Sequence, residues 1–161
     1  MILIVMGVTG AGKTTVGRLL ALELKWEFAD ADDFHPAANV EKMRRGIALL
    51  DEDREPWLER LRVAIERWIG EEKNVVLACS ALKRSYRQRL DVGSEVRFVY
   101  LKGSPKLIAE RLRARAGHFA GEAILAGQFA DLEEPKDAVT VEIGPVAEQI
   151  VSEIRERLGL A

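Results

Sequence analysis

The chain has 161 residues, of which 48% are hydrophobic and 31% charged, and this composition excludes an intrinsically disordered protein. Its 24 basic residues nearly balance its 26 acidic ones, so no overall positive field draws it to nucleic acid or to a membrane surface. The length suits one folded unit with a buried core, and we expect a single domain over 1–161.

Cysteine usage and the first residues bear on the compartment. The chain has one cysteine, Cys79, which cannot form an internal disulfide and so fits a reducing environment. The apolar run at 2–6 is far too short to span a bilayer, and no basic segment precedes it. We expect a cytoplasmic protein that acts on a small molecule, with no membrane and no nucleic-acid partner.

Strand-like and helix-like segments alternate along the chain. Residues 2–6 form a continuous apolar run, typical of a parallel strand buried on both faces. An amphipathic helix is expected over about 12–24, and a weak strand over 27–29 ends in an acidic turn. The other expected elements, in chain order, are a helix from Pro36 to about Arg45, a helix opened by Pro56, strands at 75–79 and 96–101, a helix over about 104–115, a second short helix, a strand at 139–143 and a helix opened by Pro145.

This alternation predicts an α/β fold in which helices cover both faces of a parallel sheet. In such folds ligands bind at the carboxyl ends of the strands. The polar clusters of this chain fall at those ends, so we expect them to form one site.

Residues 7–14, GVTGAGKT, match the Walker A pattern GxxxxGK[ST] without a gap. The glycines let the backbone N–H groups surround a phosphate, Lys13 reaches the β- and γ-oxygens, and the Thr14 hydroxyl ligates Mg²⁺. A buried strand precedes the pattern and a helix follows it, whose N-terminus attracts anions. The expected nucleotide-binding residues of this P-loop are Gly7, Thr9, Gly10, Ala11, Gly12, Lys13, Thr14 and Thr15.

The rest of the chain narrows the class of P-loop protein. GTPases carry a guanine-reading Asn-Lys-x-Asp, which this sequence lacks. Larger ATPases carry an aspartate after a run of four apolar residues, whereas the strand at 75–79 is followed by Ser80. These features favour an ATP-dependent kinase of a small molecule.

Asp30 and Asp32 directly follow the second expected strand, which places them beside the phosphate cradle. A kinase needs one carboxylate there to orient the acceptor hydroxyl and take its proton, and another to hold Mg²⁺ through water. The alternative is a solvated acidic turn, and the position beside a P-loop favours the catalytic interpretation.

Several further segments resemble the signature of the gluconokinases. They are DADDFHP at 30–36, Asn39, EKM at 41–43, Gly46, Leu49, DEDREPWL at 51–58, CSALKRSYR at 79–87, YLKG at 100–103, RAGHF at 115–119, QF at 128–129 and LEEP at 132–135. The resemblance runs from the P-loop to about residue 135. It implies the three-layer αβα fold that gluconokinases share with shikimate kinase and nucleoside monophosphate kinases, with five parallel strands, a substrate-binding helical region and a lid at about 115–127.

The resemblance also implies residue roles. Asp32 becomes the catalytic base, and Asp30 joins Thr14 in holding Mg²⁺. Arg54 pairs with the substrate carboxylate, for which its guanidinium is suited, the alternative being a salt bridge within 51–54. The remaining expected substrate-binding residues are His35, Lys83, Arg87, His118 and Gln128. Trp57 shares a helical face with apolar residues and is expected in the core rather than in the sugar pocket.

Arg111 and Arg115 stand four residues apart, on one face of the helix that leads into the expected lid. Lids of this kind use arginines to offset charge on the transferred phosphoryl group, and we expect Arg111 to contact the nucleotide and Arg115 to be catalytic. The alternative is an exposed basic helix. Gly127 stands where gluconokinases commonly have serine, and 120–127 is less polar than is usual for them.

The leading hypothesis is therefore an ATP:D-gluconate 6-phosphotransferase that uses ATP and Mg²⁺, and the resemblance suggests a homodimer. An alternative is a kinase of another small hydroxy acid such as shikimate, which the segments at 35–36 and 39–43 disfavour. A nucleoside monophosphate kinase would need a basic lining that the acceptor region lacks. A nucleotide-binding switch without turnover would leave Asp32 and the lid arginines without a role.

Overall fold

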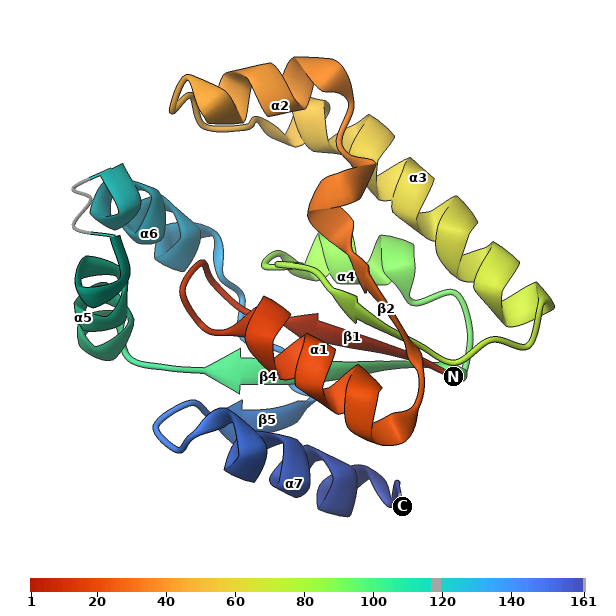
Figure 1. Cartoon of the computed structure of the whole chain (residues 1–161). Helices are drawn as coiled ribbons and strands as arrows, with labels where there is room; N and C mark the ends of the chain where they lie inside the picture. The colour runs from red at the N-terminus through yellow and green to blue at the C-terminus, as the bar shows by residue number, and fades with distance from the viewer. Residues whose placement is uncertain (117–119, 161) are drawn as a thin grey trace.

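The apolar run at 2–6 forms strand β1 (Ile2–Met6), the central strand of a parallel sheet (Figure 1). The computed structural model describes residues 1–116 and 120–160, and it describes side chains outside 115–123. Within these residues the sheet has the strand order β2-β3-β1-β4-β5. The other strands, each parallel to its neighbours, are β2 (Glu27–Asp30), β3 (Val75–Ala78), β4 (Val96–Lys102) and β5 (Val139–Glu142).

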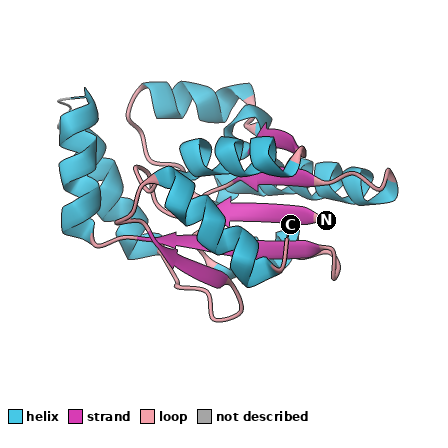
Figure 2. Cartoon of the chain, turned by 60° about the horizontal axis from the view of Figure 1, so that its bottom comes forward, coloured by secondary structure: helices cyan, strands magenta, loops and turns pink. Residues whose placement is uncertain are grey.

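Helices cover both faces of the sheet (Figures 1 and 2). One layer contains α1 and α7 and the other contains α3 and α4, while α5 and α6 lie side by side on the side to which the strands point. The helices are α1 (Lys13–Leu24), the short 3-10 helix η1 (Ala31–Phe34), α2 (Ala37–Arg44), α3 (Asp51–Gly70), α4 (Arg84–Leu90), α5 (Pro105–Ala116), α6 (Ala120–Asp131) and α7 (Ala147–Leu158).

Strand β1 is buried on both faces because its side chains alternate between the two layers. Ile2, Ile4 and Met6 belong to the core shared with α3 and α4. Leu3 and Val5 belong to the core shared with α1 and α7. All five residues are fully buried, and β3 and β4 pair with both edges of the strand. The end of β1 is therefore a fixed point from which the P-loop starts.

The predicted α/β fold with helices on both faces of a five-stranded parallel sheet is confirmed. Each predicted strand agrees with the observed one to within one residue at each end. The acidic turn after β2 is the 3-10 helix η1, a local structure that the prediction did not include. Among the described residues, no helix is both long enough and apolar enough to cross a membrane.

The start of α3 was predicted wrongly, because the helix begins at Asp51 rather than at Pro56. The carboxylate of Asp53 accepts the Leu50 backbone N–H at 2.8 Å, and three acidic residues in the first turn interact favourably with the helix dipole. Pro56 is the sixth helical residue, so its missing N–H removes only one hydrogen bond, to the carbonyl of Glu52. The earlier start brings Arg54 into the first turns of a helix.

A substitution at Gly17 tests the close contact between α1 and β2. A Cβ at this position would stand 2.9 Å from a ring carbon of Phe28. We expect Gly17→Ala to destabilise the protein by about 1–3 kcal/mol, because overpacking outweighs the better helix propensity of alanine. Gly70→Ala, whose Cβ would meet nothing within 4 Å, is the matched control and should stabilise it by about 0.5–1 kcal/mol. Denaturant unfolding of the two variants measures both values, and an equal gain from both would contradict the close contact.

Candidate active site

The P-loop curls between β1 and α1 as a phosphate cradle requires. Gly10 and Gly12 have φ angles of 79° and 94°, in the left-handed region that favours glycine. The loop ends where α1 begins, at Lys13, so the positive end of the helix dipole faces the loop. The Lys13 ammonium donates a hydrogen bond to the Val8 carbonyl at 3.0 Å, which holds the side chain across the loop.

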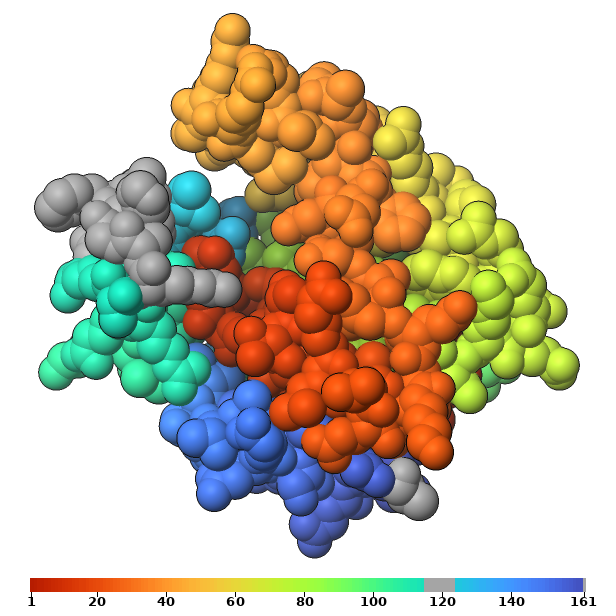
Figure 3. Space-filling view, in the orientation of Figure 1, coloured from red at the N-terminus to blue at the C-terminus, as the bar shows by residue number. Residues whose placement is uncertain are grey.

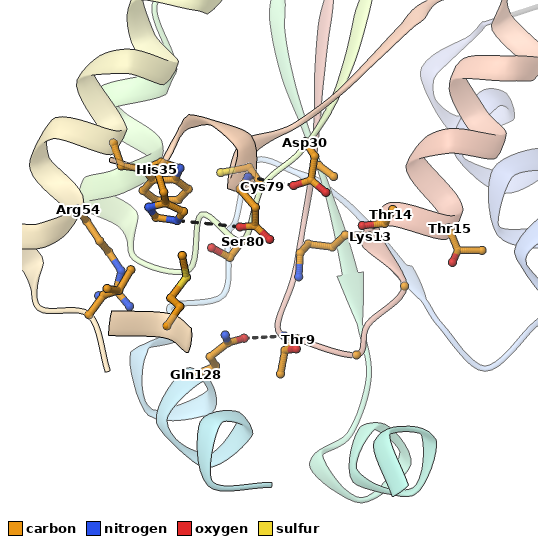
Figure 4. Close-up of a pocket in the computed structure, with 17 residues that line it drawn as sticks. Thr9, Lys13, Thr14, Thr15, Asp30, His35, Arg54, Cys79, Ser80 and Gln128 are labelled. Atoms are coloured by element: carbon orange, nitrogen blue, oxygen red, sulfur yellow. Dashed lines mark hydrogen bonds and ion pairs between the residues drawn. The ribbon is translucent and has the colours of Figure 1, made fainter. Parts of the chain in front are cut away.

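A cavity of about 260 Å³ opens beside the P-loop at the ends of β2 and β3 (Figures 3 and 4). In the space-filling view the molecule is hollowed between the P-loop in red, α2 in orange and α6 in cyan. This size suits a small molecule rather than a macromolecule. The predicted site residues that line it are Thr9, Gly10, Gly12, Lys13, Thr14, Thr15, Asp30, Asp32, His35, Arg54 and Gln128.

A second hollow lies on the other side of the P-loop and shares Gly10, Gly12 and Thr15 with the first. Its wall includes Arg111 of α5 and the start of α7, together with Ala11. The Arg111 guanidinium donates a hydrogen bond to the Ile143 carbonyl, which ties α5 to the loop after β5. The P-loop thus separates two hollows. Gly7 lines neither, because it faces Leu101 of the neighbouring strand.

Asp30 and Asp32 come together beside Lys13 because of η1. The carboxylate of Asp30 accepts the backbone N–H of Asp32 at 2.9 Å and so caps this short helix. The Asp32 side chain is largely exposed at the cavity, where desolvation and the Asp30 charge raise its pKa and Lys13 opposes the rise. Burial lowers the pKa of Lys13, against the attraction of Asp32. Asp32 is therefore a carboxylate with an enhanced tendency to accept a proton.

The donor set of the cavity fits Mg²⁺ brought in with a nucleotide. The Thr14 hydroxyl and the Asp30 carboxylate line the same cavity, and both are hard oxygen ligands. Magnesium in kinase sites takes one or two protein oxygens and completes its shell with phosphates and water. In the described part of the chain no group of three or more histidine, cysteine or acidic residues forms a separate metal site.

Arg54 lies at the end of the cavity away from the P-loop (Figure 4). Its guanidinium donates to the Tyr86 hydroxyl at 3.0 Å and lies 3.9 Å from Asp51 and 4.0 Å from Asp131. The hydrogen bonds from Tyr86 and Lys83 lower the pKa of Asp51, so this partner is ionised. The Lys83 ammonium donates to Asp51 at 3.0 Å and does not line the cavity.

Trp57 is both a core residue and a wall of the cavity, so its expected place in the core is only part of its role. The side chain is buried, and its indole N–H donates to the Ala31 carbonyl at 2.7 Å. Its ring stacks on that of His35, with centroids 4.5 Å apart and planes at 10°. Burial and the charge of Arg54 lower the pKa of His35 to about 4, so the imidazole is neutral at pH 7.

Arg87 was expected to bind the substrate, but the structure places it away from the cavity. Its guanidinium donates to the carbonyls of Ala81, Leu82 and Glu133 at 2.7–2.9 Å. The backbone of Ala81 has a φ of 44°, a conformation that L-residues rarely adopt, and the Arg87 hydrogen bond fixes its carbonyl. Arg87 therefore shapes the loop after β3 rather than contacting a ligand.

Gln128 of α6 contacts the P-loop directly. Its side-chain oxygen accepts the backbone N–H of Thr9, an interaction drawn as the dashed line between these two residues in Figure 4. The lid expected at 115–127 coincides in large part with 115–123, whose side chains lie outside the described residues. His118 lies outside them altogether, and Arg115 belongs to α5 without a described side chain. The predictions for these residues stay predictions.

Five residues that shape the cavity are not among the predicted site residues. Met43, Leu49 and Ser80 line it, and Asn39 and Tyr86 hold residues that do. All five fall inside the segments that resemble gluconokinases. Asn39 carried a further signal, since a polar residue one helical turn after His35 is placed to contact it.

Comparison with known proteins agrees with this geometry. A family model described as shikimate kinase matches residues 9–134. A probable gluconokinase of Xenopus tropicalis is 42% identical, over 96% of this chain and 91% of its own. The chain belongs to the gluconokinase family. A crystal structure of a gluconokinase from Sinorhizobium meliloti 1021 has 37% identity and a TM-score of 0.84, covering 98% of this chain and 94% of its own. An unliganded sugar kinase from Janibacter sp. HTCC2649 has 38% identity and a TM-score of 0.90, covering 99% and 95%.

Because the pKa of His35 is lowered in the folded state, we expect the stability of this gluconokinase-family protein to depend on pH. The ordinary pKa of histidine is 6.5 and the folded value is about 4, so the unfolded chain binds more protons between these two values. The free energy of unfolding should therefore fall as the pH is lowered from about 6.5 to 4, by at most about 1.4 kcal/mol per pH unit from this group. Urea unfolding of the wild type and of His35→Gln between pH 7.5 and 4 isolates the contribution. Parallel stability curves for the two proteins would contradict it.

Proposed function

We propose that the protein transfers the γ-phosphoryl group of ATP to the 6-hydroxyl of D-gluconate, with Mg²⁺, giving 6-phospho-D-gluconate and ADP. The observation that carries the proposal is the layout of one cavity in a gluconokinase-family chain. The P-loop lysine and a carboxylate with a raised pKa lie at one end, and Arg54 lies at the other. This layout suits a hydroxy acid whose reacting hydroxyl is far from its carboxylate.

The P-loop accounts for the nucleotide side of the reaction. Its backbone N–H groups and the start of α1 surround the β-phosphate, and the base side of ATP occupies the hollow next to Arg111. Lys13 leaves the Val8 carbonyl for the β- and γ-oxygens. Thr14, and Asp30 through water, would hold Mg²⁺, which would supply positive charge to offset that of the phosphates.

Asp32 accounts for the acceptor side. The acceptor hydroxyl oxygen forms the new bond to the γ-phosphorus, the bond to the β-bridging oxygen breaks, and ADP leaves with that electron pair. Asp32 takes the hydroxyl proton as the bond forms, and the raised pKa suits it to this role. Lys13 stabilises the charge that develops on the transferred group.

Arg54 explains why the proposed substrate is an acid. A planar guanidinium binds a carboxylate through two parallel hydrogen bonds, and Tyr86 holds it toward the cavity. Gln128 and His118 are further expected substrate contacts, and Arg115 is expected to act on the phosphoryl group.

A substrate panel tests the proposal. ADP release with ATP and Mg²⁺ should be fast with D-gluconate, and slower by at least about 100-fold in kcat/KM with shikimate or nucleoside monophosphates. Sorbitol, a polyol that lacks the carboxylate, is the control for Arg54. Faster turnover of shikimate than of gluconate would replace the proposed substrate, and ATP binding without any turnover of the panel would favour a switch.

Asp32→Asn tests the assignment of the base. The change keeps the shape of the side chain and removes its ability to accept a proton, so kcat should fall by about 100-fold or more while the KM for ATP stays within about 2-fold. Asp33→Asn is the matched control, because this neighbour carries the same carboxylate but does not line the cavity. Steady-state kinetics of both variants decide the point. Equal losses in the two, or a larger loss in Asp30→Asn with Asp32→Asn active, would overturn the assignment.

A further inference from the structure

Asn39 is one of two polar or charged residues that are buried in the described part of the chain, and it contacts His35, which lines the cavity. Its side-chain nitrogen is 2.7 Å from the Asp53 carbonyl oxygen and 3.1 Å from Nδ1 of His35. Asp53 is itself fixed, because its carboxylate accepts hydrogen bonds from Lys42 and from the Leu50 N–H. The orientation of the Asn39 amide is therefore fixed by its contact with Asp53.

These contacts determine which nitrogen of His35 carries the proton. A carbonyl oxygen only accepts hydrogen bonds, so the Asn39 atom that faces Asp53 is the NH₂ group. The same NH₂ group faces Nδ1 of His35 and has only hydrogens to offer. Nδ1 must then be the acceptor, and a neutral imidazole carries its one proton on Nε2. The low pKa of His35 agrees with a neutral ring at pH 7.

Nε2 of His35 lies 4.0 Å from Oδ1 of Asp32, along the dashed line at His35 in Figure 4. This distance is too long for a direct hydrogen bond, but an oxygen atom placed about 2.8 Å from both atoms fits between them. Such an oxygen would accept from the Nε2–H and donate to Asp32, so the pair is complementary to a hydroxyl. The other oxygen of Asp32 remains for the reacting hydroxyl.

We infer that Asn39 is a positioning residue that fixes His35 as an Nε2–H donor, and that His35 with Asp32 binds the hydroxyl next to the one that is phosphorylated. The bridging group is the neighbour, because a donor aimed at the reacting oxygen would engage the lone pair that attacks phosphorus. Trp57 stacks on the His35 ring and fixes its plane. The site therefore selects a terminal pair of adjacent hydroxyls, –CH(OH)–CH₂OH. This inference rests on the proposed function and adds a specificity determinant to it.

The tautomer is measured on the wild-type protein, without substrate and without activity. The chain has two histidines, so ¹⁵N NMR of the imidazoles gives two sets of signals, and His118→Gln assigns them. His35 should show the Nε2–H pattern at pH 7 and keep it down to about pH 5. The Nδ1–H pattern, or a mixture of the two, would overturn the role of Asn39 whatever the substrate is.

Asn39→Asp tests the consequence for turnover. A carboxylate at this position only accepts hydrogen bonds, so the His35 proton should move to Nδ1 and the NMR pattern should change. The kcat/KM for gluconate should fall by about 10-fold or more, with the KM for ATP within about 2-fold. Asn74→Asp, the same change at a distant exposed asparagine, should alter neither. An unchanged kcat/KM in a folded Asn39→Asp variant would contradict the inference.

A substrate analogue tests the adjacent hydroxyl directly and does not depend on the folding of Asn39→Asp. The wild type should use 5-deoxy-D-gluconate with kcat/KM about 10-fold or more below that for gluconate. In His35→Leu this ratio should shrink to within about 3-fold. Equal use of both acids by the wild type, or the same ratio in His35→Leu, would refute the hydroxyl site. Failure of the proposed function is a distinct result, since gluconate itself would then not be turned over.

Discussion

The burial of β1 is the constraint on which the rest of the molecule depends. Five consecutive apolar residues are fully buried between two helical layers and two neighbouring strands. This packing fixes the position of the end of the strand. The P-loop begins at that end, and its glycine conformations turn the chain into α1 within a few residues. A phosphate cradle made of backbone N–H groups has no side chains to adjust it. Its geometry is as rigid as the strand and the helix that hold it.

The acceptor side depends on a second, weaker constraint. Within the described residues strand β2 pairs with β3 alone, at the edge of the sheet, and Asp30 ends it by capping η1. That one hydrogen bond turns the chain so that Asp32 and His35 face Lys13 across the cavity. α3 then closes the end, because its acidic first turn begins the helix early enough to present Arg54. The nucleotide side is thus built on the sheet, and the acceptor side on short caps at helix ends.

Sequence reasoning succeeded where structure is local. The strands, the P-loop and the pairing of Asp30 with Asp32 each follow from contiguous residues, and the comparisons bear out the fold and the family. Prediction from the sequence failed for side chains whose hydrogen-bond partners lie far away along the chain. Arg87 lies in a basic segment after a strand, where a ligand-binding arginine is expected. Its guanidinium instead donates to the carbonyl of Glu133, 46 positions along the chain. Asn39 was named only as part of the gluconokinase resemblance, and its burial against the Asp53 carbonyl, 14 positions along the chain, was not predicted.

Under the proposed function, the partners of Arg54 make the binding of the substrate an exchange of one anion for another. Before any acid arrives, the guanidinium already has a phenol hydroxyl and two carboxylates around it. An incoming carboxylate therefore replaces anions instead of meeting a bare cation, and the gain in free energy is a difference between two similar environments. Selectivity for acids over neutral polyols then comes with only moderate affinity. In the proposed reaction the phosphorylated product carries the same carboxylate and would leave by the reverse exchange.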